Sequence, residues 1–146
     1  MVKYNRRSLE KWCKESNGNW EGDLASVTHQ ELYRCTLPSG KVIEDFRGVA
    51  NTSEGSFHQV TVHESVEKAN TDRHWDGGYL SAATGDRKWF DDSLDIEIDH
   101  NNGKIKFPRG QTKRGRATYP EGTIDRNGNI SSNKSWTKHQ KKPLPY

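Results

Sequence analysis

The sequence predicts an all-β protein, an antiparallel meander closed or folded over one core, with one short helix at its N-terminus. Three observations lead to this class. Turn signals recur at short intervals after Trp20, and runs that alternate apolar with polar residues lie between them. Only the first fifteen residues space their apolar side chains as a helix does. With 146 residues, the chain fits a single domain with one core.

The amino-acid composition indicates what kind of core the protein has and where in the cell we expect it. Only 29% of the residues are hydrophobic, so the core has to be thin and built from a few large side chains. No stretch approaches the roughly 20 apolar residues of a membrane-spanning helix. The polar, basic start Met1 to Arg7 is unlike a secretory signal. We therefore expect a cytoplasmic protein without a membrane partner, in which Cys13 and Cys35 are free thiols.

The first element is a short helix. Leu9, Trp12 and Cys13 fall at positions i, i+3 and i+4, which places them on one face. Ser8 is a suitable N-cap for a helix that runs through Glu15. Asn17-Gly18 is a typical C-terminal stop.

Strands are expected between the turn signals that follow. Val60, Val62 and Val66 alternate with Thr61, His63 and Ser65, which predicts a strand with one apolar face. The turn signals are Pro38-Ser39-Gly40, Ser53-Glu54-Gly55, Thr84-Gly85-Asp86, Asn102-Gly103 and Asn127-Gly128.

The segment LDIEIDHNNGKIKF predicts a hairpin with Asn102-Gly103 as a two-residue turn. In that register Ile98 lies across from Phe107 and both are buried. The other expected pairs are Asn101 with Lys104, His100 with Ile105, and Asp99 with Lys106.

The acidic residues of this hairpin raise the question of a metal site. Asp95, Glu97 and Asp99, with His100, Asp91 and Asp92 nearby, resemble ligands for a hard cation. Period-two alternation instead places the first three on one outward face, where lysine is the natural partner. We therefore interpret them as a solvated stripe and expect no metal.

No catalytic residue is assigned either. The six histidines show no partner spacing, and His58 and His63 fall on opposite faces of one strand. The sequence contains no nucleophile motif, phosphate-binding loop or CxxC pair. Whether the chain is an enzyme stays open at this point.

Charged residues are distributed unevenly along the chain. Residues 1–100 carry 12 Lys and Arg against 18 Asp and Glu, whereas residues 101–146 carry 11 against 2. Such asymmetry indicates an anion-binding surface or a solvated tail. Pro143 and Pro145 cannot donate to a sheet, so we expect residues 1–140 to form the domain and 141–146 a flexible basic tail.

Gly18, Trp20 and Gly22, placed after a short helix and before a meander, resemble the calycin superfamily of lipocalin-like β-barrels. This resemblance implies that Trp20 closes the floor of a barrel beneath the helix. The stretch LPSGKVIEDFRGV, followed by HQVTVHE and HWDGGYL, is similar to the phycobiliprotein lyases of that superfamily. The chain departs from them in its short length. It also lacks an unmistakable late arginine over Trp20, for which Arg116 and Arg126 are the candidates.

The resemblance implies a binding protein for an amphipathic, anionic small molecule. In the lyases this ligand is a bilin, a tetrapyrrole chromophore that is delivered to an acceptor protein. The site would lie at the end of the barrel away from Trp20, where aromatic walls suit planar ligands and arginine suits their carboxylates. The candidate ligand-binding residues are Trp75, Tyr79, Trp89, Phe90, Arg109 and Arg116.

A second hypothesis is a nucleic-acid-binding β-domain, in which the basic C-terminal third attracts phosphate. Its candidate residues are Lys104, Lys106, Arg109, Lys113, Arg114 and Arg116, with Lys134, Lys138, Lys141 and Lys142 on the tail. Aromatic residues for base stacking are scarce, because Phe107 is assigned to the core. A third hypothesis, a protein-interaction surface, also stays open.

Overall fold

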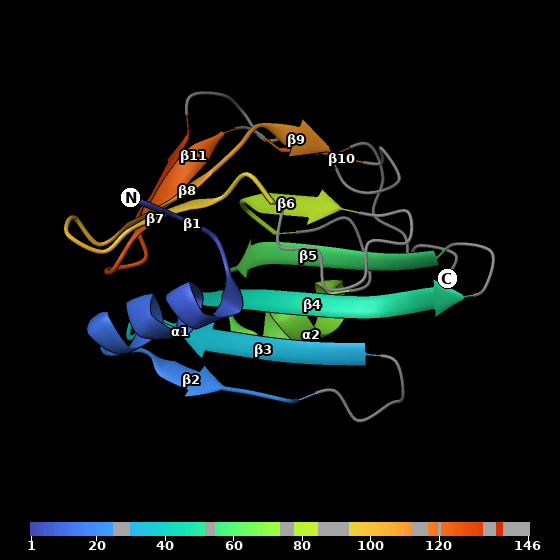
Figure 1. The fold of residues 1–146 in the computed structure, drawn as a ribbon, viewed down its shortest axis with the longest axis horizontal. Coiled ribbons are helices and arrows are strands. Elements are labelled where there is room, and N and C mark those ends of the chain that lie inside the picture. The colour runs from blue at the N-terminus through green and yellow to red at the C-terminus, as the bar shows by residue number, and fades with distance from the viewer. Residues whose placement is uncertain are drawn as a thin grey trace.

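The computed structural model describes residues 1–24, 30–51, 55–73, 78–84, 94–111, 117–119, 121–132 and 137–138. These residues form antiparallel strands and two helices, which confirms the predicted predominance of β structure. The described strands form three open sheets and no closed barrel. Figure 1 shows the arrangement.

Sheet I has the order β2-β3-β4-β5-β6, so its strands follow one another as in a meander. Its strands are β2 (Asn19–Glu21), β3 (Gln30–Thr36), β4 (Val42–Asn51), β5 (Gly55–His63) and β6 (Ser81–Thr84).

Sheet II has the order β1-β7-β8-β11-β12, and a short third sheet has the order β13-β10-β9. The strands of sheet II are β1 (Val2–Lys3), β7 (Glu97–Asp99), β8 (Lys104–Phe107), β11 (Gly122–Asp125) and β12 (Ile130–Ser132). The third sheet contains β9 (Gly110–Gln111), β10 (Ala117–Tyr119) and β13 (Thr137–Lys138).

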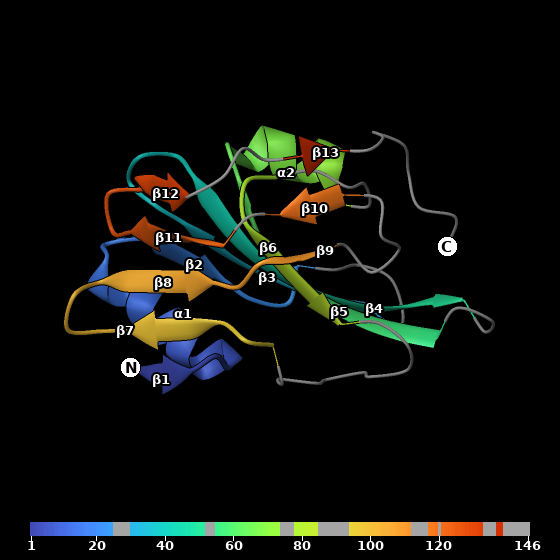
Figure 2. The ribbon, with the colours of Figure 1, turned by 90° about the horizontal axis from the view of Figure 1, so that it is seen from above.

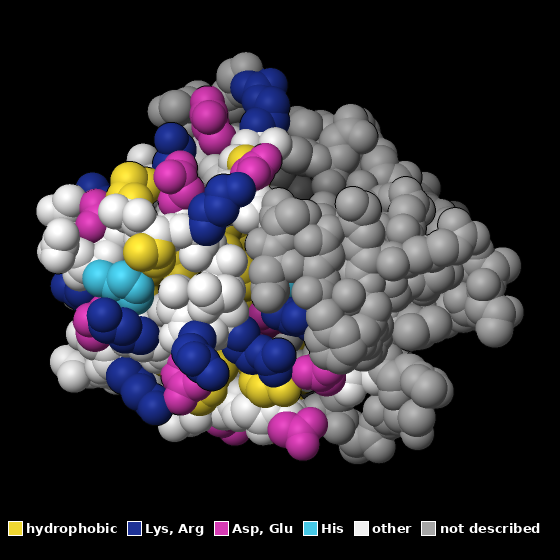
Figure 3. Space-filling model, viewed as in Figure 1, with side chains coloured by type: hydrophobic (Ala, Val, Ile, Leu, Met, Phe, Trp, Pro, Cys, Tyr) yellow, Lys and Arg dark blue, Asp and Glu magenta, His cyan; other side chains and the backbone are white. Residues whose placement is uncertain are grey.

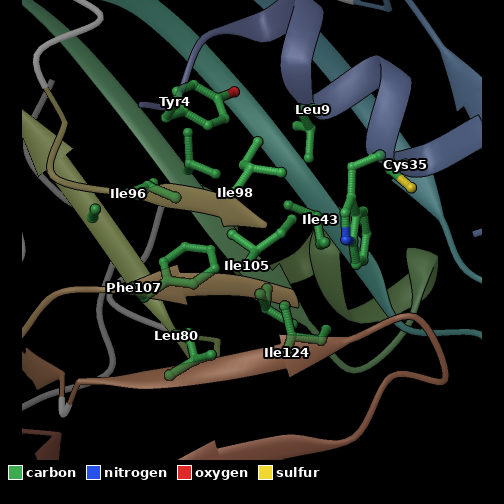
Figure 4. Close-up of a cluster of buried hydrophobic side chains, with 14 of the residues drawn as sticks. Tyr4, Leu9, Cys35, Ile43, Leu80, Ile96, Ile98, Ile105, Phe107 and Ile124 are labelled. Carbon is green, nitrogen blue, oxygen red and sulfur yellow. The ribbon is translucent and has the colours of Figure 1, made fainter. Parts of the chain in front are cut away.

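The hydrophobic core lies between sheets I and II. Ile43, Val60 and Val62 enter it from sheet I, and Ile98, Ile105, Phe107 and Ile124 enter it from sheet II. Tyr4 and Leu9, from the N-terminal segment of the chain, cover one side of this core (Figure 4). Most side chains of this described core are aliphatic, and Tyr4, Trp12 and Phe107 are its buried aromatic residues, so the core is not built from a few large side chains as the composition predicts.

The first helix, α1 (Arg6–Glu15), buries Leu9, Trp12 and Cys13 as predicted. The expected N-cap is wrong: the cap is Asn5, whose Oδ1 accepts a hydrogen bond of 2.8 Å from the Ser8 backbone N–H. An Asn in extended conformation satisfies the first-turn donors three residues earlier than expected. Asn17 adopts φ 58° just after the helix, which confirms the predicted stop.

The free-thiol prediction is also wrong, because Cys13 in α1 and Cys35 in β3 form a disulfide. The two cysteines meet because α1 packs on the face of sheet I that carries Cys35. The prediction rested on the polar, basic residues at the start of the sequence, and these say nothing about which residues the fold brings together. Gly18 lies against this bond, since a Cβ there would come within 2.7 Å of Cys13 Sγ.

The predicted strand alternation through Val66 is wrong, because Val66 begins a second helix, α2 (Val66–Asp72). The strand ends at His63, and the Ser65 side chain then caps the helix by accepting a hydrogen bond of 3.1 Å from the Lys68 N–H. Figures 1 and 2 show α1 and α2 on opposite faces of sheet I. Both faces of this sheet are therefore covered, which explains why Thr61 and His63 are buried as well as Val60 and Val62.

The β7–β8 hairpin forms with a register different from the predicted one. Ile98 lies across from Ile105, and Asp99 lies across from Lys104. Asp99 Oδ1 accepts hydrogen bonds of 3.1 Å from the N–H groups of Asn101 and Asn102, which builds a longer loop than a two-residue turn. Because the pairing changes by two residues, the inward face is preserved and Ile98 and Phe107 are both buried.

The outward face of this hairpin agrees with the solvated-stripe interpretation. Asp95 and Glu97 are exposed and Asp99 is half-buried, with lysines across from the latter two. The predicted turns at Pro38-Ser39-Gly40 and Asn127-Gly128 also connect paired strands, β3 with β4 and β11 with β12.

Candidate functional site

A cavity of about 540 Å³ lies between the first half of α1 and sheet I. Arginine and aromatic side chains dominate its lining. The lining residues are Asn5, Arg6, Arg7, Glu10, Trp20, Tyr33 and Arg47. We refer to it as the α1 cavity.

Its aromatic part comes from β2 and β3. The rings of Trp20 and Tyr33 are stacked, with centroids 6.2 Å apart and planes at 18°. The Arg6 guanidinium carbon lies 4.0 Å from the centroid of the Tyr33 ring. Arg6 Nη1 also donates to Glu31 Oε1 at 3.2 Å, and the Tyr33 hydroxyl donates to the same oxygen at 2.9 Å. Burial and this last hydrogen bond raise the pKa of Tyr33.

Behind the cavity, a buried polar network is centred on Asp45. Its Oδ1 accepts hydrogen bonds from His58 Nε2 at 2.8 Å and from Arg47 Nε at 3.2 Å, and its Oδ2 accepts one from the Tyr4 hydroxyl. Asp45 and His58 are fully buried. Burial alone would raise the pKa of Asp45, but the hydrogen bond and charge of His58, with Arg47 and Tyr4, outweigh it and lower the pKa to about 2.

Strand alternation explains how these groups come together. Ile43, Asp45 and Arg47 occupy alternate positions of β4 and therefore share the face that carries α1. His58 lies directly across from Arg47 on β5. The apolar face of β4 thus becomes charged toward one end, where Arg47 reaches the cavity.

This arrangement can hold an anion beside a flat ring. Guanidinium groups bind carboxylates and phosphates with two parallel hydrogen bonds, and a Trp-Tyr pair offers a stacking surface. Asp45 and His58 do not line the cavity, and Asp45 connects to it through its hydrogen bond with Arg47.

A second polar cluster lies on the other face of sheet I, beneath α2. Glu44 accepts hydrogen bonds from Arg34 Nε at 3.0 Å and from Arg73 Nε at 2.8 Å. Burial raises the pKa of Glu44, but the hydrogen bond and charge of Arg73, with the charge of Arg34, lower it overall. This cluster attaches α2 to the sheet.

His63 belongs to the α2 cluster. Its Nε2 lies 3.8 Å from Glu44 Oε1, and its Nδ1 finds no hydrogen-bond partner among the described residues. Burial is the main reason that the pKa of His63 is lowered to about 4. The ring is therefore neutral at pH 7, and its contact with Glu44 is not an ion pair there.

Most ligand-binding residues predicted from the sequence lie outside the described residues: Trp75, Trp89, Phe90 and Arg116. Tyr79 is 40% exposed, donates from its hydroxyl to Glu64, and does not line the α1 cavity. Arg109 is exposed between β8 and β9. The structure does not bring these two residues together with the α1 cavity.

Trp20 is half-buried and lines the cavity next to α1. The barrel-floor role that the calycin resemblance implies for it stays a prediction. Of the two arginines considered as partners of Trp20, Arg126 instead donates from its Nη2 to the His100 carbonyl at 2.6 Å, and Arg116 lies outside the described residues. The arginines of the cavity are Arg6, Arg7 and Arg47, which sequence reasoning missed.

The basic C-terminal third is only partly described. Lys104 is exposed on β8 but lies across from Asp99 and Asp125, and Lys106 lies across from Glu97. Acidic side chains therefore offset the lysines of this strand. Figure 3 shows the same intermixing of Lys, Arg, Asp and Glu over the described part of one face. Lys138 lies on β13, whereas Lys113, Arg114, Arg116, Lys134, Lys141 and Lys142 lie outside the described residues.

Within the described part of the chain, no group of three or more His, Cys, Asp or Glu residues could hold a metal ion. None of the helices described is long and apolar enough to cross a membrane. Comparison with known proteins finds no family model, no curated protein and no solved structure that matches the chain. The geometry of the α1 cavity is therefore the basis for a functional proposal.

Proposed function

We propose that the protein binds a planar, anionic small molecule in the α1 cavity. The observation that carries this proposal is the Trp20–Tyr33 stack beside three arginines in one cavity of about 540 Å³. Cavities of this size are typical of small-molecule sites. The ring of the ligand would contact Trp20, and its acidic group would face the arginines.

The charge balance of the lining favours an anion. Arg6 is paired with Glu31, Arg47 with Asp45, and Glu10 with Lys14 at 2.7 Å. Arg7 makes no ion pair with any described residue. Its exposed guanidinium is thus the charge in the lining that is left for a ligand.

A bilin belongs to this chemical class, because it combines a conjugated ring system with two carboxylates. The proposal therefore keeps the ligand type that the calycin resemblance implies, with delivery to an acceptor protein as a further prediction, and moves the site from the far end to the α1 side. Closure of the sheets into a lipocalin-like barrel and a cytoplasmic location likewise remain predictions.

The test is a titration with 8-anilinonaphthalene-1-sulfonate, a planar aromatic anion whose fluorescence reports binding. N-phenyl-1-naphthylamine has the same rings without the sulfonate and is the matched ligand control. We expect saturable binding of the sulfonate, weaker binding of the neutral amine, and quenching of tryptophan fluorescence that is reduced in Trp20→Phe.

Two variants of α1 separate a site from general charge. Arg7→Ala removes a guanidinium that lines the cavity, and Lys11→Ala removes a cation one turn later that does not. We expect Arg7→Ala to weaken sulfonate binding about threefold to tenfold, a typical effect of one partly exposed charged contact, and Lys11→Ala to leave it unchanged. Equal effects of the two variants, or no saturable binding, would overturn the proposal.

A further inference from the structure

The disulfide joins the two elements that form the walls of the α1 cavity. One wall is the first half of α1, and Cys13 follows the lining residue Glu10 by one helical turn. The other wall is β2 and β3, where Cys35 lies directly across from Trp20 and two residues after Tyr33. The Cys13–Cys35 bond therefore covalently links the helix to the strand that carries the aromatic surface.

We propose that the Cys13–Cys35 disulfide is a redox-controlled clasp of the α1 cavity, so that a dithiol reductant which cleaves it loosens α1 and weakens binding of the planar anion. This inference rests on the proposed function. In a reducing compartment such a bond would be transient or redox-sensing.

The chemical step is thiol–disulfide exchange. One thiolate of the reductant attacks a sulfur of the bond to form a mixed disulfide, and its second thiolate displaces the protein sulfur. The reductant leaves as a cyclic disulfide. Two electrons and two protons pass to the protein, and Cys13 and Cys35 become thiols.

Burial makes reduction depend on movement of the helix. Both half-cystines are fully buried, and Gly18 packs against both sulfur atoms. A reductant therefore reaches the bond only after the packing around it opens, as it does when α1 moves away from β3. After reduction, the links between this helix and sheet I among the described residues include core packing of Leu9 and Trp12 and the contacts of Arg6 with Glu31 and Tyr33.

The disulfide and the bound ligand should each affect the stability of the other. A ligand that contacts both walls favours the closed arrangement, in which the disulfide is inaccessible. If the bond strengthens ligand binding, then the ligand must favour the bond to the same extent. Ligand binding and reduction are therefore expected to oppose each other.

The first measurement compares 8-anilinonaphthalene-1-sulfonate binding to the oxidised protein and to the protein kept reduced in dithiothreitol, with circular dichroism as a check on the fold. We expect the reduced protein to bind at least about fivefold more weakly, the lower end of typical coupling between sites. The Cys13→Ala/Cys35→Ala variant should behave like the reduced protein. Dissociation constants that agree within twofold would overturn the clasp.

The second measurement uses the wild-type chain alone, so that its result tests the proposal even if the reduced protein loses its fold. The rate of reduction by dithiothreitol is followed by thiol trapping and mass spectrometry, with and without saturating sulfonate. We expect the sulfonate to slow reduction several-fold. An unchanged rate would overturn the proposal.

Ile124→Val is the control for global unfolding, because it weakens the core at sheet II and leaves the disulfide intact. If reduction proceeds by local movement of α1, its rate in this variant matches the wild type. Acceleration in proportion to the lost stability would overturn the clasp. Failure of the oxidised protein to bind sulfonate overturns the proposed function itself, whereas equal binding in both redox states overturns only the clasp.

Discussion

His58 Nε2 lies 2.8 Å from Asp45 Oδ1 in the interior of the protein, and both side chains are fully buried. Because the pKa of Asp45 is lowered to about 2, the carboxylate is ionised and acts only as an acceptor, so His58 donates. The same carboxylate accepts from Tyr4, which precedes α1, and from Arg47, which lines the α1 cavity. Asp45 therefore connects the N-terminal segment, sheet I and the cavity.

Asp45→Asn is expected to destabilise the protein by about 3 kcal/mol, because it removes a buried charge and leaves its donors without a full partner. The urea midpoint should fall, and binding of 8-anilinonaphthalene-1-sulfonate to the remaining folded protein should weaken as Arg47 loses its fixed position. Asp95→Asn, on the exposed face near β7, is the matched control and should change the midpoint little. Equal midpoints for the two variants would contradict this account of Asp45.

The α2 cluster predicts a specific loss of stability in acid. The pKa of His63 is about 4 in the folded protein, against an ordinary value of 6.5. Between these values the unfolded chain binds a proton that the folded protein does not, so the free energy of unfolding falls as the pH falls from 6.5 toward 4. Above pH 6.5 the ring is neutral in both states and contributes no slope.

The groups around His63 do not change this direction. Glu44 on β4 and Asp72 on α2 favour the protonated ring, whereas burial, Arg73 after α2 and Arg34 on β3 oppose it and prevail. Urea midpoints of His63→Gln should therefore depend less on pH between 7 and 4.5 than those of the wild type. His100→Gln, which removes a histidine outside this cluster, is the matched control. A wild-type slope in His63→Gln would show that other groups cause the acid sensitivity.

Sequence patterns predicted the parts of this fold that depend on local chemistry. The helical spacing of Leu9, Trp12 and Cys13 identified the buried face of α1, and the alternation in β7 and β8 identified their inward residues. The hairpin register was missed because Asp99 caps the loop with its side chain, and this interaction competes with the turn preference of Asn-Gly. The helix α2 was missed because Ser65 was assigned to a strand rather than to an N-cap.

The site was harder to predict, because its residues come from four separate segments. Arg6 and Arg7 begin a helix, Trp20 and Tyr33 lie on neighbouring strands, and Arg47 comes from β4. One usable signal was present: alternation places Asp45 and Arg47 on the same face as Ile43, and charges on an inward face require partners. The disulfide left no comparable signal, since it depends on how α1 packs against β3.

The register of the β7–β8 hairpin can be measured directly. We expect short cross-strand proton distances in nuclear Overhauser spectra between Ile98 and Ile105 and between Asp99 and Lys104. Contacts of Ile98 with Phe107 as directly opposed residues would support the two-residue turn instead. Asp99→Ala removes the side-chain acceptor for Asn101 and Asn102, so amide exchange at these two positions should accelerate.

Gly18→Ala tests the packing of the chain against the disulfide. A Cβ at this position would lie 2.7 Å from Cys13 Sγ and 3.1 Å from both Cys35 Sγ and the Cys13 carbonyl oxygen. Sulfur atoms held in a bond cannot easily move aside, so we expect a loss of about 1 to 3 kcal/mol, as in other overpacked sites. The measurement is the urea midpoint of the oxidised protein.

A double-mutant cycle then separates the sulfur contacts from the backbone contact. In a Cys13→Ala/Cys35→Ala background both sulfur atoms are absent, and the added methyl group meets mainly the Cys13-position carbonyl. Gly18→Ala should therefore cost less in this background than in the wild type, and the difference is the energy of the clash with the disulfide. If the cost is the same in both backgrounds, the glycine is required by the backbone contact rather than by the disulfide. A smaller cost would show that position 18, between the helix and Trp20, requires glycine because the disulfide approaches it closely.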